Sequence, residues 1–210
     1  MSARPSKAPT IPPHPGLEVR EDEVAWNGRF PVQRVRFTYR RFDGARSPEL
    51  VWELWRRGGA VAVLPYDPWT DRICLIEQFR LPALAAGFEP VMTECVAGLL
   101  EAGEDPADCA RRETAEEAGL ETDRLESIGH YMLMQGGCDE HIHLYCGRTR
   151  LPDSGANHGL AAEGEDIRTL LLPAEEGFAR LDGGAIRNAT AALCLFWLRQ
   201  NRARLREAWT

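Results

Sequence analysis

The 210-residue chain lacks long apolar runs and an excess of positive charge. No stretch approaches the roughly 18 apolar residues that a membrane span needs, and the N-terminus lacks the apolar segment of a signal peptide. The formal net charge is −7, which argues against a general nucleic-acid-binding surface. We therefore expect a cytoplasmic protein that binds neither membranes nor nucleic acid.

The cysteines and the common catalytic motifs exclude further classes. None of the six cysteines lies in a CxxC pair, and their spacing matches no zinc motif. Most lie in apolar segments, so we interpret them as reduced thiols that act as small buried hydrophobes. Gly-x-Ser-x-Gly and Walker patterns are absent, which excludes a serine hydrolase of that type and a P-loop enzyme.

Composition and periodicity divide the chain into three parts. Residues 1–16 contain five prolines and few apolar side chains, which predicts a disordered tail. Residues 17–57 contain alternating segments broken by turns, which predict a small antiparallel β element with one wet face. Residues 58–210 alternate buried-type strands with helical patterns, and we expect an α+β domain in which helices cover a mixed sheet.

Within the third part, we expect a strand pair at 60–66 and 73–79, a loop at 81–90 and a short strand at 93–97. Further strands are predicted at 128–134, 141–148 and 167–172, with a polar loop at 150–165. Pro173 is suited to open a helix that stops near Gly183, and a last helix is predicted over 188–208.

The segment between residues 98 and 120 is predicted to contain a helix, and the residue types at both ends indicate where it begins and stops. Asp105 is a natural N-cap, Pro106 suits the first helical position, and Gly119 suits the position just after the helix. On this helix Glu116 and Glu117 lie three and four residues after Glu113, so the three carboxylates share one face.

Glu113, Glu116 and Glu117 on one helical turn favour a hard cation. Like charges at this spacing repel one another, and a cation such as Mg²⁺ removes the repulsion because it prefers carboxylate oxygens. Arg112 is spaced to pair with Asp108 and Glu116 and would orient the carboxylates. The alternative for an isolated Glu-x-x-Glu-Glu is a solvated acidic helix face.

Four histidines lie near these segments. His141 and His143 alternate on one predicted strand, and His130 and His158 lie in other segments. No further ligands at the spacing of a zinc motif are evident, so we interpret the histidines as structural.

The glutamates are part of a longer pattern. Gly98, five residues, Glu104, seven residues, Arg112-Glu113, two residues, Glu116-Glu117, one residue and Gly119-Leu120 together resemble the full Nudix box. Only Thr114 departs, where the family usually has an aliphatic residue, and this position packs inward and tolerates small residues. The chain resembles the Nudix hydrolases and, within them, the bacterial ADP-ribose pyrophosphatase branch.

Further motifs carry the resemblance, which covers most of the chain from about Trp26 to Trp209. They are 76–80 (Ile-Glu-Gln-Phe-Arg), Gly136-Gly137 with Glu140, and 158–167. The resemblance implies the Nudix fold, an α/β/α sandwich preceded by the small β element. It also implies Mg²⁺-dependent hydrolysis of ADP-ribose to AMP and ribose 5-phosphate, with Mn²⁺ as a possible substitute, and a homodimer.

The resemblance also implies roles for particular residues. The metal ligands would be the Ala97 carbonyl, Glu113, Glu117 and Glu165, with Glu116 binding directly or through water. Glu163 matches the general base; the alternative is an exposed loop glutamate. Arg80, which could instead form a salt bridge at a strand end, and Glu140 match substrate-holding positions. Weaker matches to substrate contacts are Arg29, Phe30, Glu53, Arg57 and Leu99.

The substrate is the least constrained part of this interpretation. The box is common to pyrophosphatases of other nucleoside diphosphate sugars, such as GDP-mannose or UDP-glucose. Trp52 also stands where relatives of the ADP-ribose branch carry arginine. A non-catalytic nucleotide sensor is a third alternative, although such proteins usually lose box carboxylates and this chain retains them all.

Overall fold

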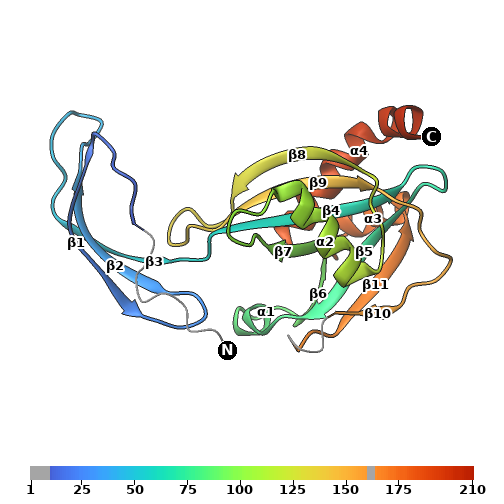
Figure 1. The fold of residues 1–210 in the computed structure, drawn as a ribbon, viewed down its shortest axis with the longest axis horizontal. Coiled ribbons are helices and arrows are strands. Elements are labelled where there is room, and N and C mark those ends of the chain that lie inside the picture. The colour runs from blue at the N-terminus through green and yellow to red at the C-terminus, as the bar shows by residue number, and fades with distance from the viewer. Residues whose placement is uncertain (1–9, 160–163) are drawn as a thin grey trace. The chain divides into compact units, whose positions relative to one another are not determined.

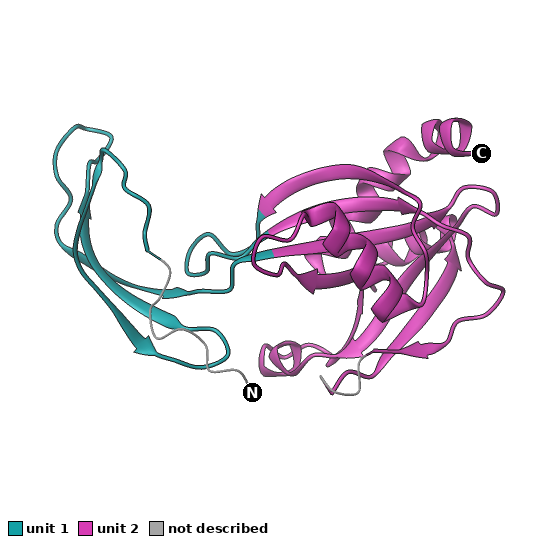
Figure 2. Ribbon diagram, viewed as in Figure 1, with its two compact units in different colours: residues 1–59, 132–141 teal, residues 60–131, 142–210 magenta. Residues whose placement is uncertain are grey.

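The chain folds into two compact units, which Figure 2 shows in different colours. The structure is a computed structural model that describes residues 10–159 and 164–210. The first unit comprises residues 1–59 and 132–141, and the second comprises residues 60–131 and 142–210. Residues 1–9 of the predicted N-terminal tail lie outside the described residues.

The first unit is built on a three-stranded antiparallel sheet of β1 (Leu17–Trp26), β2 (Val32–Tyr39) and β3 (Leu50–Trp55), with β2 in the centre. Val35 and Phe37 on β2 are buried, whereas the alternate residue Arg34 is exposed. The predicted antiparallel strands with one wet face are therefore confirmed. The 132–141 segment joins this unit where the amide of Trp55 donates a 2.8 Å hydrogen bond to the carbonyl of Gly137.

The second unit contains an eight-stranded sheet with helices on both faces (Figure 1). Its main path runs in the order β10-β11-β5-β4-β9-β8, with β6 paired to β5 and β7 paired to β4. The strands are β4 (Gly59–Asp67), β5 (Arg72–Phe79), β6 (Val91–Glu94), β7 (Val96–Leu99), β8 (Arg124–Met132), β9 (His141–Arg148), β10 (Asn157–His158) and β11 (Ile167–Pro173).

Two apolar clusters fill the space between this sheet and its helices. One joins Leu64 and Leu144 of the sheet to Leu195 and Leu198 of α4 (Ala189–Trp209). The other joins the opposite face to Ala110 and its neighbours on α2 (Pro106–Ala118). Strand β4 supplies both clusters by alternation along its length, because successive side chains of a strand point to opposite faces. The predicted α+β sandwich is confirmed.

Several predicted boundaries need correction. The 81–90 segment is not all loop, because α1 (Leu81–Ala85) forms there with its proline in the first turn, where a missing amide costs no hydrogen bond. The single strand expected at 93–97 is two strands, β6 and β7, that pair with different neighbours. Strand β8 begins earlier and ends earlier than 128–134. Pro173 caps α3 (Ala174–Asp182) instead of occupying its first position.

The six cysteines are free and buried, as their apolar sequence context predicts. Burial raises the pKa of Cys74 to about 12, so its thiol stays protonated near neutral pH. Among the described residues, no helix is long and apolar enough to cross a membrane.

Candidate active site

Helix α2 is fixed at both ends as the sequence predicts. The Asp105 carboxylate accepts hydrogen bonds from the amides of Ala107 at 2.8 Å and Asp108 at 3.4 Å. Gly119 ends the helix with φ at 64°, a left-handed conformation that glycine adopts without strain. Thr114 is fully buried, and its hydroxyl donates to the Ala110 carbonyl one turn earlier at 2.7 Å, so its polar group needs no other partner.

The helix places two glutamates against strand β7. The amide of Ala97 donates to Oε2 of Glu117 at 2.9 Å, and Glu117 is only 3% exposed. Glu113 lies one turn earlier, and its carboxyl carbon would be 1.8 Å from a Cβ atom built on Gly98. Because Gly98 has no side chain, the Glu113 carboxylate occupies the space beside it. Both glutamates therefore lie against the β7 backbone.

The electrostatics of this cluster disfavour several negative charges without a cation. Burial, together with the charges of Glu113 and Glu165, raises the pKa of Glu117 to about 8. Burial also raises the pKa of Glu113, against the opposing effect of Arg112 and with the help of Glu116 and Glu165. Glu165 interacts with both acids although it lies far along the chain, as a half-buried residue just before β11.

Arg112 contacts three glutamates. Its Nε donates to Oε1 of Glu104 at 3.0 Å, and its Nη1 donates to Oε1 of Glu113 at 2.7 Å and to Oε2 of Glu116 at 3.1 Å. The hydrogen bonds from Arg112 lower the pKa of Glu104 to about 2. Arg112 thus holds the Glu113 carboxylate in place through a direct hydrogen bond.

The predicted Arg112–Asp108 pair is wrong. Asp108 pairs with Arg111 at 3.3 Å, while Arg112 turns toward Glu104 on the loop before the helix. That loop brings Glu104 within reach because the Glu101 amide donates to its Oε2 at 2.9 Å. The contact spans eight residues, so helical spacing alone does not reveal it.

Arg80 and Leu99 lie beside the cluster. The Arg80 guanidinium, just after β5, donates to Glu94 of β6 at 2.7 Å and 3.1 Å. Its positive charge also lowers the pKa of Glu117, although burial has the larger, opposite effect. Glu94 is a buried carboxylate that the sequence analysis did not include. The Leu99 carbonyl accepts a weak hydrogen bond from the thiol of Cys109 at 3.6 Å.

The donor set fits a hard divalent cation. Glu113, Glu117 and Glu165 interact with one another, and two of these carboxylates have raised pKa values. Oxygen ligands of this kind suit Mg²⁺ or Mn²⁺, and a bound cation would favour the charged forms that burial disfavours. Glu163, the expected general base, lies outside the described residues.

The remaining expected substrate residues lie in the first unit. Arg57 donates to Oε1 of Glu140 at 2.8 Å, and its guanidinium lies 4.4 Å from the ring centre of Phe30. The guanidinium of Arg29 also lies over the Phe30 ring, 5.6 Å from its centre. Glu53 pairs in register with Arg34, one residue beyond Trp52. The structure therefore brings Arg29, Phe30, Arg57 and Glu140 together.

Trp52 has a packing role within the same unit. Its ring meets the ring of Phe37 edge to face, with centroids 5.1 Å apart, yet half of its surface is exposed. The aromatic side chain at this position therefore covers the apolar face of β2 and offers no charge to a phosphate.

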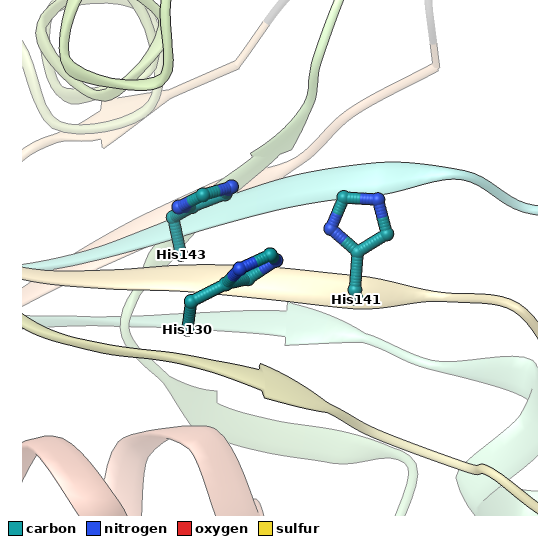
Figure 3. Close-up of side chains that lie close together, drawn as sticks. All are labelled: His130, His141 and His143. Atoms are coloured by element: carbon teal, nitrogen blue, oxygen red, sulfur yellow. The ribbon is translucent and has the colours of Figure 1, made fainter.

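Three of the histidines that the sequence suggested were structural lie close together in the fold, a grouping that residue spacing did not reveal. The rings of His130 and His143 are stacked with centroids 3.8 Å apart, and His141 lies beside them (Figure 3). One ligand atom from each lies within 4.8 Å of the other two. The sequence signal was a His-x-His pair on β9 together with a histidine on β8, the strand paired with it.

The Nudix resemblance is confirmed by comparison with known proteins. Residues 56–191 match the NUDIX domain. The chain belongs to this family. It is 35% identical over 193 residues to the ADP-ribose pyrophosphatase of Escherichia coli strain K12, with 92% of each chain covered. It is 34% identical to that of Haemophilus influenzae, covering 92% of this chain and 90% of the relative.

Two further relatives bear on function and fold. The GDP-mannose pyrophosphatase of Cronobacter sakazakii is 31% identical, covering 85% of this chain and 93% of that protein. A solved structure described as an ADP compounds hydrolase matches the fold with a TM-score of 0.70 at 20% identity, over 93% of this chain and 100% of that one. This NUDIX protein is a hydrolase of pyrophosphate bonds.

Proposed function

We propose that this NUDIX hydrolase cleaves the pyrophosphate bond of ADP-ribose, giving AMP and ribose 5-phosphate, with Mg²⁺ as cofactor and Mn²⁺ as a substitute. The observation that carries this proposal is the placement of Glu113 and Glu117 against the backbone of β7, with Glu165 interacting electrostatically with both. Three interacting acids, of which Glu117 is buried and the other two are half-buried, do not fit a solvated helix face but suit a metal ion that binds phosphate.

The choice of ADP-ribose is supported by the relatives. The ADP-ribose pyrophosphatases are 34–35% identical over 92% of the chain, whereas the GDP-mannose pyrophosphatases are 27–31% identical over 85%. Both groups share the reaction, so the difference bears on the sugar and the base. Because Trp52 stands where the ADP-ribose branch carries arginine, GDP-mannose and similar nucleotide sugars are the alternative substrates.

The cluster residues have separate roles in the proposed hydrolysis. The Ala97 carbonyl, Glu113, Glu117 and Glu165 would hold the metal, with Glu116 binding it directly or through water. Bound Mg²⁺ supplies positive charge for phosphate oxygens and lowers the pKa of water. Arg112 orients Glu113, and Glu163 accepts the proton of the attacking water as general base.

Substrate binding uses cations and aromatic rings. Arg80 contacts phosphate, and the charge of Glu94 beside it keeps the guanidinium in place. The nucleoside and its ribose are contacted by residues of the first unit, namely Arg57, Phe30, Arg29, Glu53 and Glu140. Leu99 is a further contact in the second unit. The active protein is a homodimer, which sedimentation velocity would test.

A substrate panel tests the proposed function. ADP-ribose, GDP-mannose and UDP-glucose are incubated with enzyme and Mg²⁺ in the presence of a phosphatase, which releases phosphate from the monoester products but not from the intact substrates. We expect kcat/KM to be at least tenfold higher for ADP-ribose. A tenfold preference for either other sugar would contradict the assignment.

Isosteric replacement tests the metal ligands. Glu113→Gln and Glu117→Gln each remove one charged oxygen ligand, and we expect kcat to fall at least about 100-fold, or ~2.7 kcal/mol of transition-state stabilisation. Circular dichroism should show an unchanged fold. Glu121→Gln, at an exposed position just after α2, is the matched control and should keep its activity. Undiminished turnover in both variants would refute the metal assignment.

A further inference from the structure

Three of the five histidines of the chain gather on two neighbouring strands. His130 is on β8, and His141 and His143 are on β9, which is hydrogen-bonded to β8 in the sheet. His141 is the first residue of β9, so the strand backbone itself sets its position beside His143. Figure 3 shows the three side chains close together, with the rings of His130 and His143 stacked and His141 beside them.

The strand pattern keeps these rings out of the apolar core. Ile142 and Leu144 on β9 are buried in the cluster that packs against α4. His141 and His143 alternate with them and therefore lie on the opposite face of the sheet. Both are half-buried, and His130 is exposed, so a small ion from solvent can reach the group.

We propose that His130, His141 and His143 form a site for a divalent transition metal ion, with zinc as its preferred occupant. Zinc binds imidazole nitrogens at about 2.0–2.1 Å, which places the nitrogens of a tetrahedral site roughly 3.4 Å apart. The three ligand atoms already lie within 4.8 Å of one another. Rotation of the rings about χ2, a broad torsion in histidine, closes the remaining distance.

The chemistry of this group separates it from the carboxylate cluster. Imidazole nitrogens suit zinc, copper and nickel, whereas carboxylates suit Mg²⁺ and Mn²⁺. Three imidazoles leave a fourth zinc position for water or another ligand. The proposal does not depend on the pyrophosphatase activity, because it concerns other residues and another kind of ion.

A bound zinc ion would cross-link β8 to β9 at the ends where both strands meet the 132–141 segment. This segment carries Asp139, whose carboxylate accepts hydrogen bonds from the amides of Arg57 at 2.6 Å and Gly58 at 3.1 Å. It also carries Glu140, which pairs with Arg57. The ion would therefore stabilise the base of a segment that holds expected substrate contacts.

Calorimetric titration with zinc tests the site. Metal-free full-length protein is titrated with Zn²⁺ at pH 7.5 in excess Mg²⁺, which occupies the carboxylates. We expect one equivalent to bind to the wild type. His130→Gln and His143→Gln should weaken binding at least as much as the 10–100-fold loss caused by removing an outer-shell partner.

His14→Gln is the matched control, because His14 is exposed and lies outside the group, and it should bind zinc like the wild type. A Glu113→Gln/Glu117→Gln double variant should also retain the zinc equivalent. With Co²⁺ in place of zinc, a four-coordinate site should give the intense visible absorption of that geometry, and His143→Gln should lose it.

Two results would overturn the proposal. One is the absence of a saturable zinc equivalent in the wild type. The other is unchanged zinc affinity in His130→Gln, which replaces an exposed side chain and so remains informative even if His143→Gln fails to fold.

Discussion

The backbone amide of Ala97 donates a 2.9 Å hydrogen bond to Oε2 of Glu117, and so ties the last turn of α2 to β7. The amide favours the charged carboxylate, but burial and the nearby charges of Glu113 and Glu165 outweigh it and raise the pKa of Glu117. A carboxylate that we propose as a metal ligand is therefore held where its charge costs stability in the metal-free protein.

Replacing Glu117 should consequently stabilise the metal-free protein. The pKa of Glu117 is about 8 in the folded chain, against 4.5 for the ordinary group. The folded state thus holds a proton that the unfolded state has lost between these two values, and wild-type stability falls as pH rises through that window. Glu117→Gln removes the titration and retains an oxygen that accepts from Ala97.

We expect Glu117→Gln to unfold at a higher temperature than the wild type in EDTA at pH 8.5, with a gain on the order of 3 kcal/mol. Near pH 4.5 the difference should vanish, because Glu117 is then protonated in the folded wild type too. Thermal unfolding at both pH values measures this, and a gain independent of pH would contradict it.

Gly98 should be required for activity more than for folding. A Cβ at this position would lie 1.8 Å from the carboxyl carbon of Glu113, which must move away. Because the displaced group is the end of a flexible side chain, Gly98→Ala should lower the unfolding temperature by less than about 4 °C. We expect kcat to fall at least about 100-fold, since the proposed metal ligand Glu113 is displaced.

Gly16→Ala is the matched control for this substitution. A Cβ on Gly16 would make only an ordinary contact of 3.4 Å with Cβ of Arg40. Steady-state kinetics and thermal unfolding of the two variants distinguish a displaced ligand from a general loss of stability. Equal activity in Gly98→Ala and wild type would show that Glu113 does not need its observed position.

Local features of the fold could be read from the sequence because they depend on neighbouring residues. Asp105 and Gly119 set the ends of α2 through hydrogen bonds and backbone conformation within one turn. The shared face of Glu113 and Glu117 follows from helical periodicity alone. The hairpin of β4 and β5 was likewise predictable, because a turn separates two apolar runs.

Contacts between distant segments could not be predicted in this way. Arg80 meets Glu94 only because β6 pairs with β5, and Arg112 meets Glu104 only because the preceding loop folds back. His130 joins His143 through the pairing of β8 with β9. In each case, the deciding fact is which strand or loop lies beside another, and residue spacing does not contain it.

Arg112 should act on catalysis through metal affinity. It contacts Glu113, an expected metal ligand, at 2.7 Å and Glu104 at 3.0 Å and 3.1 Å. Lysine keeps the charge but lacks the planar fork that bridges several carboxylates. We expect Arg112→Lys to raise the Mg²⁺ concentration for half-maximal activity by about 10–100-fold, as loss of an outer-shell partner does.

Arg111→Lys provides the comparison, since Arg111 is the exposed neighbour and pairs only with Asp108 among the ion pairs of the described residues. Activity measured against Mg²⁺ concentration at saturating substrate should change for Arg112→Lys and stay the same for Arg111→Lys. A loss of kcat that excess Mg²⁺ does not restore would instead give Arg112 a direct part in the reaction.

Asp71 should control the acid stability of the second unit. It lies in the turn between β4 and β5, where its carboxylate accepts hydrogen bonds from the hydroxyl of Tyr66 at 2.8 Å and from Nε of Arg202 on α4 at 2.8 Å. Burial alone would raise the pKa of Asp71, but the bonds from Arg202 and Tyr66 reverse this and lower it. The turn is thereby attached to the C-terminal helix.

We expect Asp71→Asn to destabilise the protein at pH 7 by about 1–3 kcal/mol, because Arg202 and Tyr66 lose their charged acceptor. Asparagine tolerates the left-handed backbone at this position, where φ is 59°, so the loss reports on the charge. A lowered pKa stabilises the fold above the ordinary value of 3.8, and this contribution disappears as pH falls through the lower folded value. Denaturant unfolding should therefore show a stability gap between variant and wild type at pH 7 that closes as the pH falls below 3.8. The exposed substitution Asp153→Asn should leave stability unchanged at both pH values, and a gap for Asp71→Asn that persists in acid would place its origin in packing rather than charge.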